Sequence, residues 1–157
     1  MGTVAHILVD GSNLIHAWAD LRSETRRGDK TVARERLVGR LLVLLPVACE
    51  RLTVVFDGRG ADLVVEHPHG PESVAVIYTP AGVTADDVIE RLVARAADPA
   101  TCLVATADQS ERSTVEAAGA VWCSPDELAA RVERAGEQQE RRVAGLARDN
   151  GRKWNRR

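Results

Sequence analysis

The chain of 157 residues lacks several features that define large classes of proteins. Aromatic residues make up only 3% of the sequence, so the hydrophobic core must be largely aliphatic. No apolar run approaches the roughly 18 residues that a membrane-spanning helix needs, and no signal peptide is evident. The net charge of −2 excludes a uniformly basic nucleic-acid-binding protein, although it is compatible with a local basic surface.

Cysteine clusters and nucleotide-binding motifs are also missing. The three cysteines, Cys49, Cys102 and Cys123, form no Cys-x-x-Cys pair and no zinc-ligand pattern, which is typical of a reducing compartment. Neither a Gly-x-Gly-x-x-Gly fingerprint nor a Walker A sequence is present. We therefore expect a cytoplasmic protein that contacts no membrane and binds no nucleotide cofactor.

The chain does show an alternation of short β-branched runs with helical patterns. Strands are expected near residues 4–9, 51–56, 74–78, 101–106 and 120–122, with 63–65 as a further candidate. Helices are expected near 12–21, 31–45, 85–97, 109–118 and 125–149, the last interrupted near Gly136. This alternation predicts an α/β domain of three layers with a mostly parallel sheet of about five strands.

Two polar segments fall outside these elements. Residues 22–30 are expected to form a mobile loop, because they contain no apolar side chain. The basic segment after Asn150 is expected to be disordered. The predicted organisation is therefore one domain over residues 1–149 and a basic tail over residues 150–157.

Acidic residues stand just beyond the apolar runs. Asp10, Asp57 and Asp108 each follow a predicted strand, and Asp86 and Asp87 open the helix that comes after residues 74–78. In open parallel sheets the ligand site lies outside the carboxyl ends of the strands, so these side chains are expected to converge. Carboxylates brought together repel unless a cation lies between them. Mg²⁺ prefers such oxygen ligands and supports phosphoryl-transfer chemistry.

Each acidic residue also has a purely structural interpretation. Asp10 and Asp108 could cap the helices that follow them, and Asp57 could sit in a turn. Thr84 and Asp87 have the spacing of a capping box, which favours Asp86 over Asp87 as a metal ligand. Helix capping or a turn explains each acidic residue taken alone. That four strand ends all carry one is harder to explain as chance, so the joint pattern favours a metal site.

Basic residues are concentrated in two places. The first surrounds the first strand–helix connection and contains Arg22, Arg26, Arg27, Lys30, Arg34 and Arg36. The second lies around Trp154 and contains Arg152, Lys153, Arg156 and Arg157. Arginine beside an aromatic ring suits phosphate contact and base stacking. A solvated loop and a solvated tail are the alternative interpretations.

With these residues assembled, the chain resembles the YacP-like branch of the NYN family of PIN-like ribonucleases. The resemblance rests on four segments that cover most of the chain in the family's order: Ile7–Ile15 with its Asp-Gly-Ser-Asn motif, Val54–Gly58, Tyr78–Glu90 with its Thr-Ala-Asp-Asp motif, and Val104–Asp108. It implies a PIN-like, Rossmann-like sheet and an endoribonuclease that depends on Mg²⁺ or Mn²⁺. It also implies an association with ribosomes or translated mRNA in some members.

Carried over by motif, the acidic site would consist of Asp10, Asn13, Asp86 and Asp108, with Asp57 and Asp87 nearby. The leading hypothesis is an endoribonuclease that cleaves single-stranded RNA, in which the three aspartates hold metal directly or through water. Asn13 would orient a ligand or the scissile phosphate. The residues expected to contact RNA are Ser12, Arg22, Arg26, Arg27, Lys30, Thr106, Arg152, Lys153 and Trp154.

Two other classes of protein compete with this hypothesis. The first is a non-catalytic RNA- or ribosome-binding module that keeps the fold. The second is a phosphatase or a phospho-acceptor receiver domain on a similar sheet. A receiver domain needs a lysine near a strand end, and neither Lys30 nor Lys153 has that position, so this class is the less favoured of the two.

Overall fold

A sheet of six strands forms the centre of the molecule, in a computed structural model that describes residues 4–68, 70 and 72–155. The strands are β1 (His6–Asp10), β2 (Arg51–Phe56), β3 (Val64–Glu66), β4 (Val74–Tyr78), β5 (Cys102–Ala105) and β6 (Val121–Cys123), in the order β3-β4-β2-β1-β5-β6. All neighbours pair in parallel except β3, which runs antiparallel to β4 at the edge. The predicted mostly parallel sheet is confirmed, and the candidate at 63–65 accounts for β3.

The central strands form because both of their faces are covered by apolar side chains. Ile7, Leu8 and Val9 of β1 are fully buried although they alternate between the two faces of the sheet. Ile7 and Val9 belong to one hydrophobic core and Leu8 to a second core on the opposite side. A parallel strand covered on both sides needs such a continuous apolar run rather than an alternating pattern.

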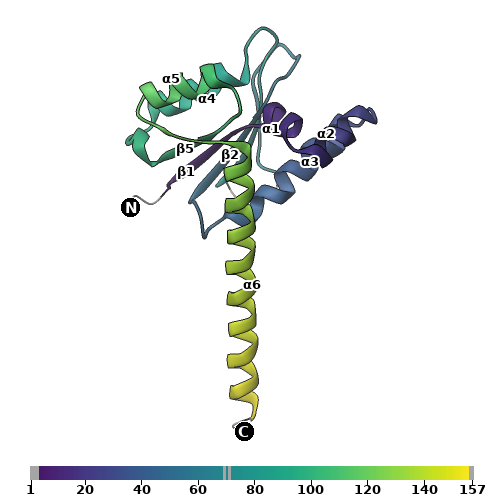
Figure 1. Ribbon diagram of the computed structural model, residues 1–157, viewed down its shortest axis with the longest axis vertical. Helices are drawn as coiled ribbons and strands as arrows, with labels where there is room; N and C mark the ends of the chain where they lie inside the picture. The colour runs from purple at the N-terminus through teal and green to yellow at the C-terminus, as the bar shows by residue number, and fades with distance from the viewer. Residues whose placement is uncertain (1–3, 69, 71, 156–157) are drawn as a thin grey trace.

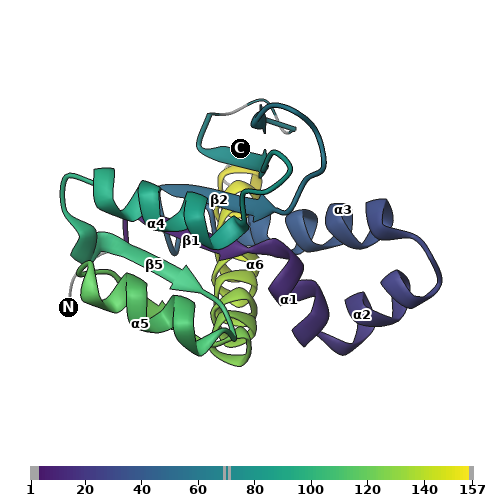
Figure 2. The ribbon, with the colours of Figure 1, turned by 90° about the horizontal axis from the view of Figure 1, so that it is seen from above.

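Helices cover the two faces and complete the three predicted layers (Figure 2). One face carries α1 (Gly11–Ala17), α2 (Ala19–Arg26), α3 (Lys30–Leu41), the short helix η1 (Leu42–Leu44) and the beginning of α6 (Pro125–Asn155). The other face carries α4 (Ala85–Arg95) and α5 (Gln109–Ala117), and the short helix η2 (Pro99–Thr101) leads into β5.

The predicted loop over residues 22–30 was wrong for most of its length, because α2 extends to Arg26. Only Leu21 of α2 is buried, so the helix leaves almost no periodic apolar signal in the sequence. Trp18 is extended and separates α1 from α2, and Gly28, with φ of 89°, reverses the chain into α3. Arg22 and Arg26 are therefore held on α2, which packs beside α3.

The predicted interruption near Gly136 was wrong, and so was the predicted disorder for residues 151–155, which continue α6. The rest of the predicted tail, Arg156 and Arg157, lies outside the described residues. Helix α6 is continuous over 31 residues and projects far beyond the sheet (Figure 1). Its near part is fixed by Gln139, whose Nε2 donates to the carbonyl oxygens of Val43 and Leu45 at 3.0 and 3.1 Å. Among the described residues, no helix has the length and apolar character needed to cross a bilayer.

The parallel strands bring several connections to one edge of the sheet. β1, β2, β4 and β5 all end there, and α1, α4 and α5 begin close to these ends. We call this side the carboxyl edge. It is the edge at which the sequence predicts a functional site.

Candidate metal centre

Three carboxylates from three separate segments meet at the carboxyl edge. Asp10 is the last residue of β1, Asp86 lies in the first turn of α4, and Glu111 lies in the first turn of α5. One carboxylate oxygen from each lies within 4.8 Å of the others. We call Asp10, Asp86 and Glu111 the acidic cluster.

The acidic cluster is buried and contains a carboxylate without partners. Glu111 is only 1% exposed and Asp10 6% exposed. Neither Oε1 nor Oε2 of Glu111 has a hydrogen-bond partner, and none of the three residues belongs to a salt bridge within the described part of the chain. Buried polar atoms are nearly always paired, because an unpaired charge away from water is costly. These orphaned oxygens therefore point to a missing positive partner.

The same burial disturbs the protonation of two members of the cluster. Burial raises the pKa of the Glu111 carboxyl above its ordinary value, and the negative charge of Asp10 raises it further. Burial likewise raises the pKa of Asp10, although the neighbouring Glu111 side chain and the Asn13 N–H favour its ionised form and oppose the shift. Without a cation the cluster would hold a proton on Glu111 at neutral pH, and a bound cation would displace it.

The ligand chemistry of the cluster fits a hard divalent cation. All of its donors are carboxylate oxygens, with no nitrogen or sulfur ligand among them. Mg²⁺ and Mn²⁺ prefer such oxygens, whereas zinc sites usually include histidine or cysteine. The residues present thus fit the class of metal ion that the sequence predicts.

Other predicted acidic residues cap helices instead of joining the cluster. The Asp108 Oδ1 accepts from the N–H groups of Ser110 and Glu111, at 2.8 and 3.3 Å. The Asp57 Oδ1 accepts from the Ala85 N–H at 2.9 Å, at the beginning of α4. These groups lie near the cluster, but their bonded oxygens already satisfy helix N-termini.

Asp87 belongs to the capping box that its spacing predicts. Its side chain accepts from the Thr84 N–H at 3.3 Å, and the Thr84 hydroxyl accepts from the Asp87 N–H at 3.2 Å. Asp86, which the sequence ranks above Asp87, is the one that joins the acidic cluster. The capping box therefore separates the roles of two adjacent aspartates.

Two other predicted site residues hold the backbone of the carboxyl edge together. The Asn13 Oδ1 accepts from the Ala107 N–H at 2.8 Å and so joins the end of β1 to the loop after β5. Thr106 is fully buried, and its hydroxyl accepts from the Asp108 N–H at 3.1 Å. Burial keeps Thr106 away from any surface that RNA could contact, contrary to the sequence-based expectation.

Glu111 is the functional candidate that the sequence analysis did not select. Its place three residues after Asp108 suggests the second half of a capping box. The structure gives it no such bond, and it is buried beside Val115 on an otherwise polar helix. An acidic residue four positions before Val115, the only large apolar residue of α5, was the signal available in the sequence.

Two glycines permit close packing of the strand ends at the carboxyl edge. A Cβ atom on Gly11, the residue after Asp10, would lie 2.3 Å from Cε1 of the fully buried Phe56. A Cβ on Gly58 would lie 2.1 Å from the Thr79 carbonyl oxygen. Both positions require glycine because the ends of β1, β2 and β4 approach so closely.

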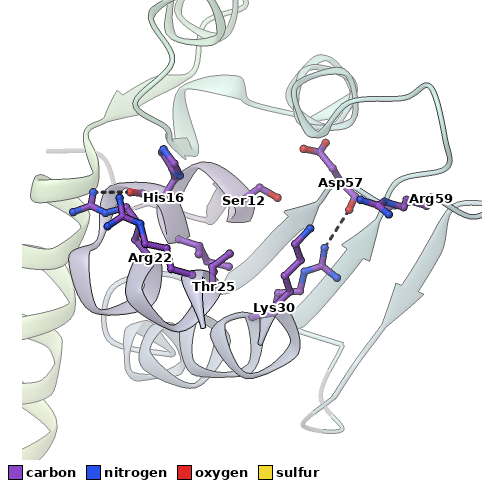
Figure 3. Close-up of a pocket in the computed structure, with 11 residues that line it drawn as sticks. Ser12, His16, Arg22, Thr25, Lys30, Asp57 and Arg59 are labelled. Carbon is purple, nitrogen blue, oxygen red and sulfur yellow. Dashed lines mark hydrogen bonds between the residues drawn. The ribbon is translucent and has the colours of Figure 1, made fainter. Parts of the chain in front are cut away.

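A basic pocket adjoins the cluster between α1, α2 and α3 and the end of β2 (Figure 3). It has a volume of about 470 Å³. We define the basic pocket by its lining residues, which are Ser12, Ile15, His16, Arg22, Thr25, Arg26, Lys30, Arg34, Asp57, Gly58 and Arg59. Four of the predicted RNA contacts, Ser12, Arg22, Arg26 and Lys30, thus share one hollow.

The remaining predicted RNA contacts are not in this pocket. Arg27 caps the end of α2 and is exposed, but it does not line the hollow. Arg152 is exposed on the projecting part of α6. The side chains of Lys153 and Trp154 lie outside the described part of the structure.

The sheet order, the acidic cluster at the carboxyl edge and the similarity to solved structures define a domain of the PIN-like nuclease class. The family model of the YacP-like NYN domain matches residues 7–157, and the chain belongs to this family.

Relatives in Bacillus subtilis agree with the assignment. The chain is 35% identical over 140 residues to the uncharacterized protein YacP of strain 168, covering 87% of this chain and 80% of that protein. The crystal structure of Rae1 (YacP) from B. subtilis matches with a TM-score of 0.71 and 30% identity, over 92% of this chain and 83% of the other. A tryptophan-to-leucine variant of Rae1 matches with the same TM-score and 32% identity, over 91% and 84%.

Proposed function

We propose that this protein is an endoribonuclease that needs Mg²⁺ or Mn²⁺ and cleaves single-stranded RNA. The observation that carries the proposal is the pair of Glu111 oxygens, buried without partners beside Asp10 and Asp86 in a chain of a nuclease family. Repulsion within such a cluster is relieved by a cation, and the same cation can activate water and stabilise charge in the hydrolysis of a phosphodiester.

The residues divide into three tasks in this proposal. Asp10, Asp86 and Glu111 would hold the metal ion, which when bound supplies a water of lowered pKa and stabilises charge on the attacked phosphate. Asp108, and less directly Asp57 and Asp87, would act through metal-bound water with the oxygens that capping leaves available. Asn13 would orient the scissile phosphate, because its bond to Ala107 fixes its amide at the carboxyl edge.

We further propose mRNA as the substrate, with the ribosome as a partner. The support is the resemblance in the Asp-Gly-Ser-Asn and Thr-Ala-Asp-Asp motifs and the shape of α6, which projects from the domain with exposed arginines. Arg141, Arg148 and Arg152 on this projection suit contact with an RNA backbone.

A non-catalytic RNA- or ribosome-binding module is the second candidate. It is favoured by the basic pocket and the projecting α6, neither of which needs the acidic cluster in order to bind RNA. In that case Glu111 would keep its proton and the cluster would hold no metal.

The deciding experiment compares the wild type with Asp86→Asn on a labelled mRNA, with Mg²⁺ or Mn²⁺ and with ribosomes present or absent. The proposal predicts cleavage by the wild type alone, lost on chelation, and a folded variant. RNA binding without cleavage under every condition would favour the binding module instead. Cleavage by Asp86→Asn at the wild-type rate would contradict the assignment of the metal centre.

A further inference from the structure

We propose that the basic pocket is a subsite for one unpaired nucleotide, which it holds next to the phosphate that the metal centre attacks. The proposal rests on the proposed function for the identity of its ligand, but its site and its binding chemistry are separate from the acidic cluster. According to this proposal, the basic pocket is what makes the protein select single-stranded RNA.

The first argument is the balance of charge in the pocket. Five cationic side chains line it, against the single carboxylate of Asp57. The five are Arg22, Arg26, Lys30, Arg34 and Arg59. None of them forms a salt bridge with a described residue. An excess of unpaired positive charge in one hollow calls for a ligand that brings phosphate oxygens.

Neighbouring arginines on the same helices show that this excess is local. Arg36 pairs with Glu24 at 2.9 Å, and Arg40 pairs with Asp20. These two salt bridges join α2 to α3 away from the pocket lining. The helices therefore neutralise their arginines where they contact each other and leave them unpaired where they face the hollow.

The second argument is that two guanidinium groups are oriented before any ligand arrives. The Arg22 Nη1 donates to the His16 carbonyl oxygen at 3.1 Å, and the Arg34 Nη2 donates to the Asp57 carbonyl oxygen at 3.3 Å (Figure 3). Arg34 also lies over the rings of Phe56 and Tyr78, 5.2 and 5.5 Å from their centroids. Side chains already held in this way lose less entropy when they bind a ligand.

The third argument is the shape and position of the hollow. Its volume of about 470 Å³ lies within the range of small-ligand sites, and Ile15 gives it an apolar surface for a base. Ser12 lies two residues after Asp10, and Asp57 accepts from the residue that precedes Asp86. The basic pocket is therefore adjacent to the acidic cluster. A nucleotide next to the scissile bond would occupy this position.

A nucleotide can enter this pocket only if its base is free. A base in a duplex must first be unpaired and unstacked, which costs a few kcal/mol. An unpaired nucleotide binds without this free-energy cost, and its exposed base can contact the protein directly. The preference for single-stranded over double-stranded RNA should therefore depend on the basic pocket, even when no metal is bound.

The experiment measures binding of a labelled seven-nucleotide single-stranded RNA to the full-length protein in EDTA, over a range of salt concentrations. Lys30→Ala should weaken binding about tenfold and reduce the slope of log K against log salt by about 0.7, as expected for one lost phosphate contact. Thr25→Trp, which fills the pocket without changing charge, should weaken binding to a similar extent. A blunt duplex of the same sequence should bind more weakly to the wild type.

Arg95→Ala is the matched control, because Arg95 is an exposed arginine at the end of α4 and does not line the pocket. It should leave binding of the single strand unchanged. Equal losses for Arg95→Ala and Lys30→Ala, full binding by Thr25→Trp, or equally tight binding of the duplex would overturn the proposal. Circular dichroism must show native folding of each variant, and Lys30→Ala, at an exposed site, serves as the test if Thr25→Trp does not fold.

Failure of this proposal is distinguishable from failure of the proposed function. Binding in EDTA does not depend on cleavage, so a protein with no nuclease activity can still show the subsite. Conversely, metal-dependent cleavage that Lys30→Ala and Thr25→Trp leave unaltered would retain the nuclease and reject the subsite.

Discussion

The acidic cluster and the basic pocket adjoin at the carboxyl edge, but they stabilise their charges in opposite ways. In the cluster, Asp10 and Glu111 are buried, and the Glu111 oxygens lack partners among the described residues. In the pocket, Arg26 and Lys30 are exposed to solvent. Water can hydrate the cations of the pocket, whereas it cannot reach Glu111. Burial, more than charge density, therefore distinguishes the region for which we propose a bound ion.

The largest difference between the two regions should appear in the rate of cleavage. Asp10→Asn removes a charge that the proposed metal ion needs, so kcat should fall by about 10²- to 10³-fold. The variant should still bind RNA, because the basic pocket is unchanged. The measurement is single-turnover cleavage with saturating protein, together with RNA binding in EDTA. A cleavage rate within a factor of two or so of the wild type would contradict the role of Asp10.

Stability in the absence of metal should change in the opposite direction to activity. Without metal near neutral pH, Glu111 is protonated in the folded protein but ionised in the unfolded chain, so folding requires the uptake of a proton. Glu111→Gln removes this requirement, so it should raise the free energy of unfolding in EDTA near neutral pH by about 1 to 3 kcal/mol. Urea denaturation measures this change. A variant less stable than the wild type in EDTA would show that Glu111 has a stabilising partner.

The pH dependence follows from the raised pKa values of Asp10 and Glu111. The folded protein holds protons that the unfolded chain has already released, so the wild type in EDTA should lose stability as the pH rises from the ordinary carboxyl range through the raised folded values. Glu111→Gln should show a flatter profile over the same range, measured by urea denaturation at several pH values. A wild-type profile that rises with pH there would contradict the assignment.

Substitution in the basic pocket should affect binding more than chemistry. Arg26→Ala should raise KM about tenfold and leave kcat nearly unchanged, because the arginine holds RNA in both the ground and transition states. Steady-state cleavage measures both constants. Arg36→Ala is the control, since Arg36 pairs with Glu24 and should affect neither constant. A fall in kcat for Arg26→Ala would place that residue in the chemistry instead.

The smallest effect should come from a capping carboxylate. Asn caps a helix about as well as Asp, so Asp108→Asn should change the free energy of unfolding by less than about 0.5 kcal/mol. Thermal unfolding measures this. The cleavage rate then decides the second role of Asp108: an unchanged rate would leave it as a cap of α5, and a loss would support action through metal-bound water.

The sequence predicted much of the frame around the site. Runs such as Ile7–Val9 and Val54–Phe56 are apolar on both faces of a strand, so they identify parallel strands and place Asp10 and Asp57 at the carboxyl edge. The Thr84 spacing explains only Asp87 as a cap, and Asp86 is the one of the two that lies in the acidic cluster.

The rest depended on tertiary packing, which the local pattern does not encode. Glu111 and Asp108 both follow β5, and only the packing of α5 against β6 and α4 decides which of them is buried with Asp10. Helix α2 has one buried residue and no detectable period. Helix α6 continues past Gly136, supported by Gln139 and by an ion pair of Glu137 with Arg141 at 3.7 Å.

Metal binding by the acidic cluster is the central claim, and thermal unfolding with and without Mn²⁺ tests it most directly. At a concentration about 100 times Kd, the ion should stabilise the wild type by about 2.7 kcal/mol. Glu111→Gln should gain much less, while Asp108→Asn should respond like the wild type. Equal stabilisation of the wild type and Glu111→Gln, or none for either, would contradict the assignment of Asp10, Asp86 and Glu111 as the metal centre.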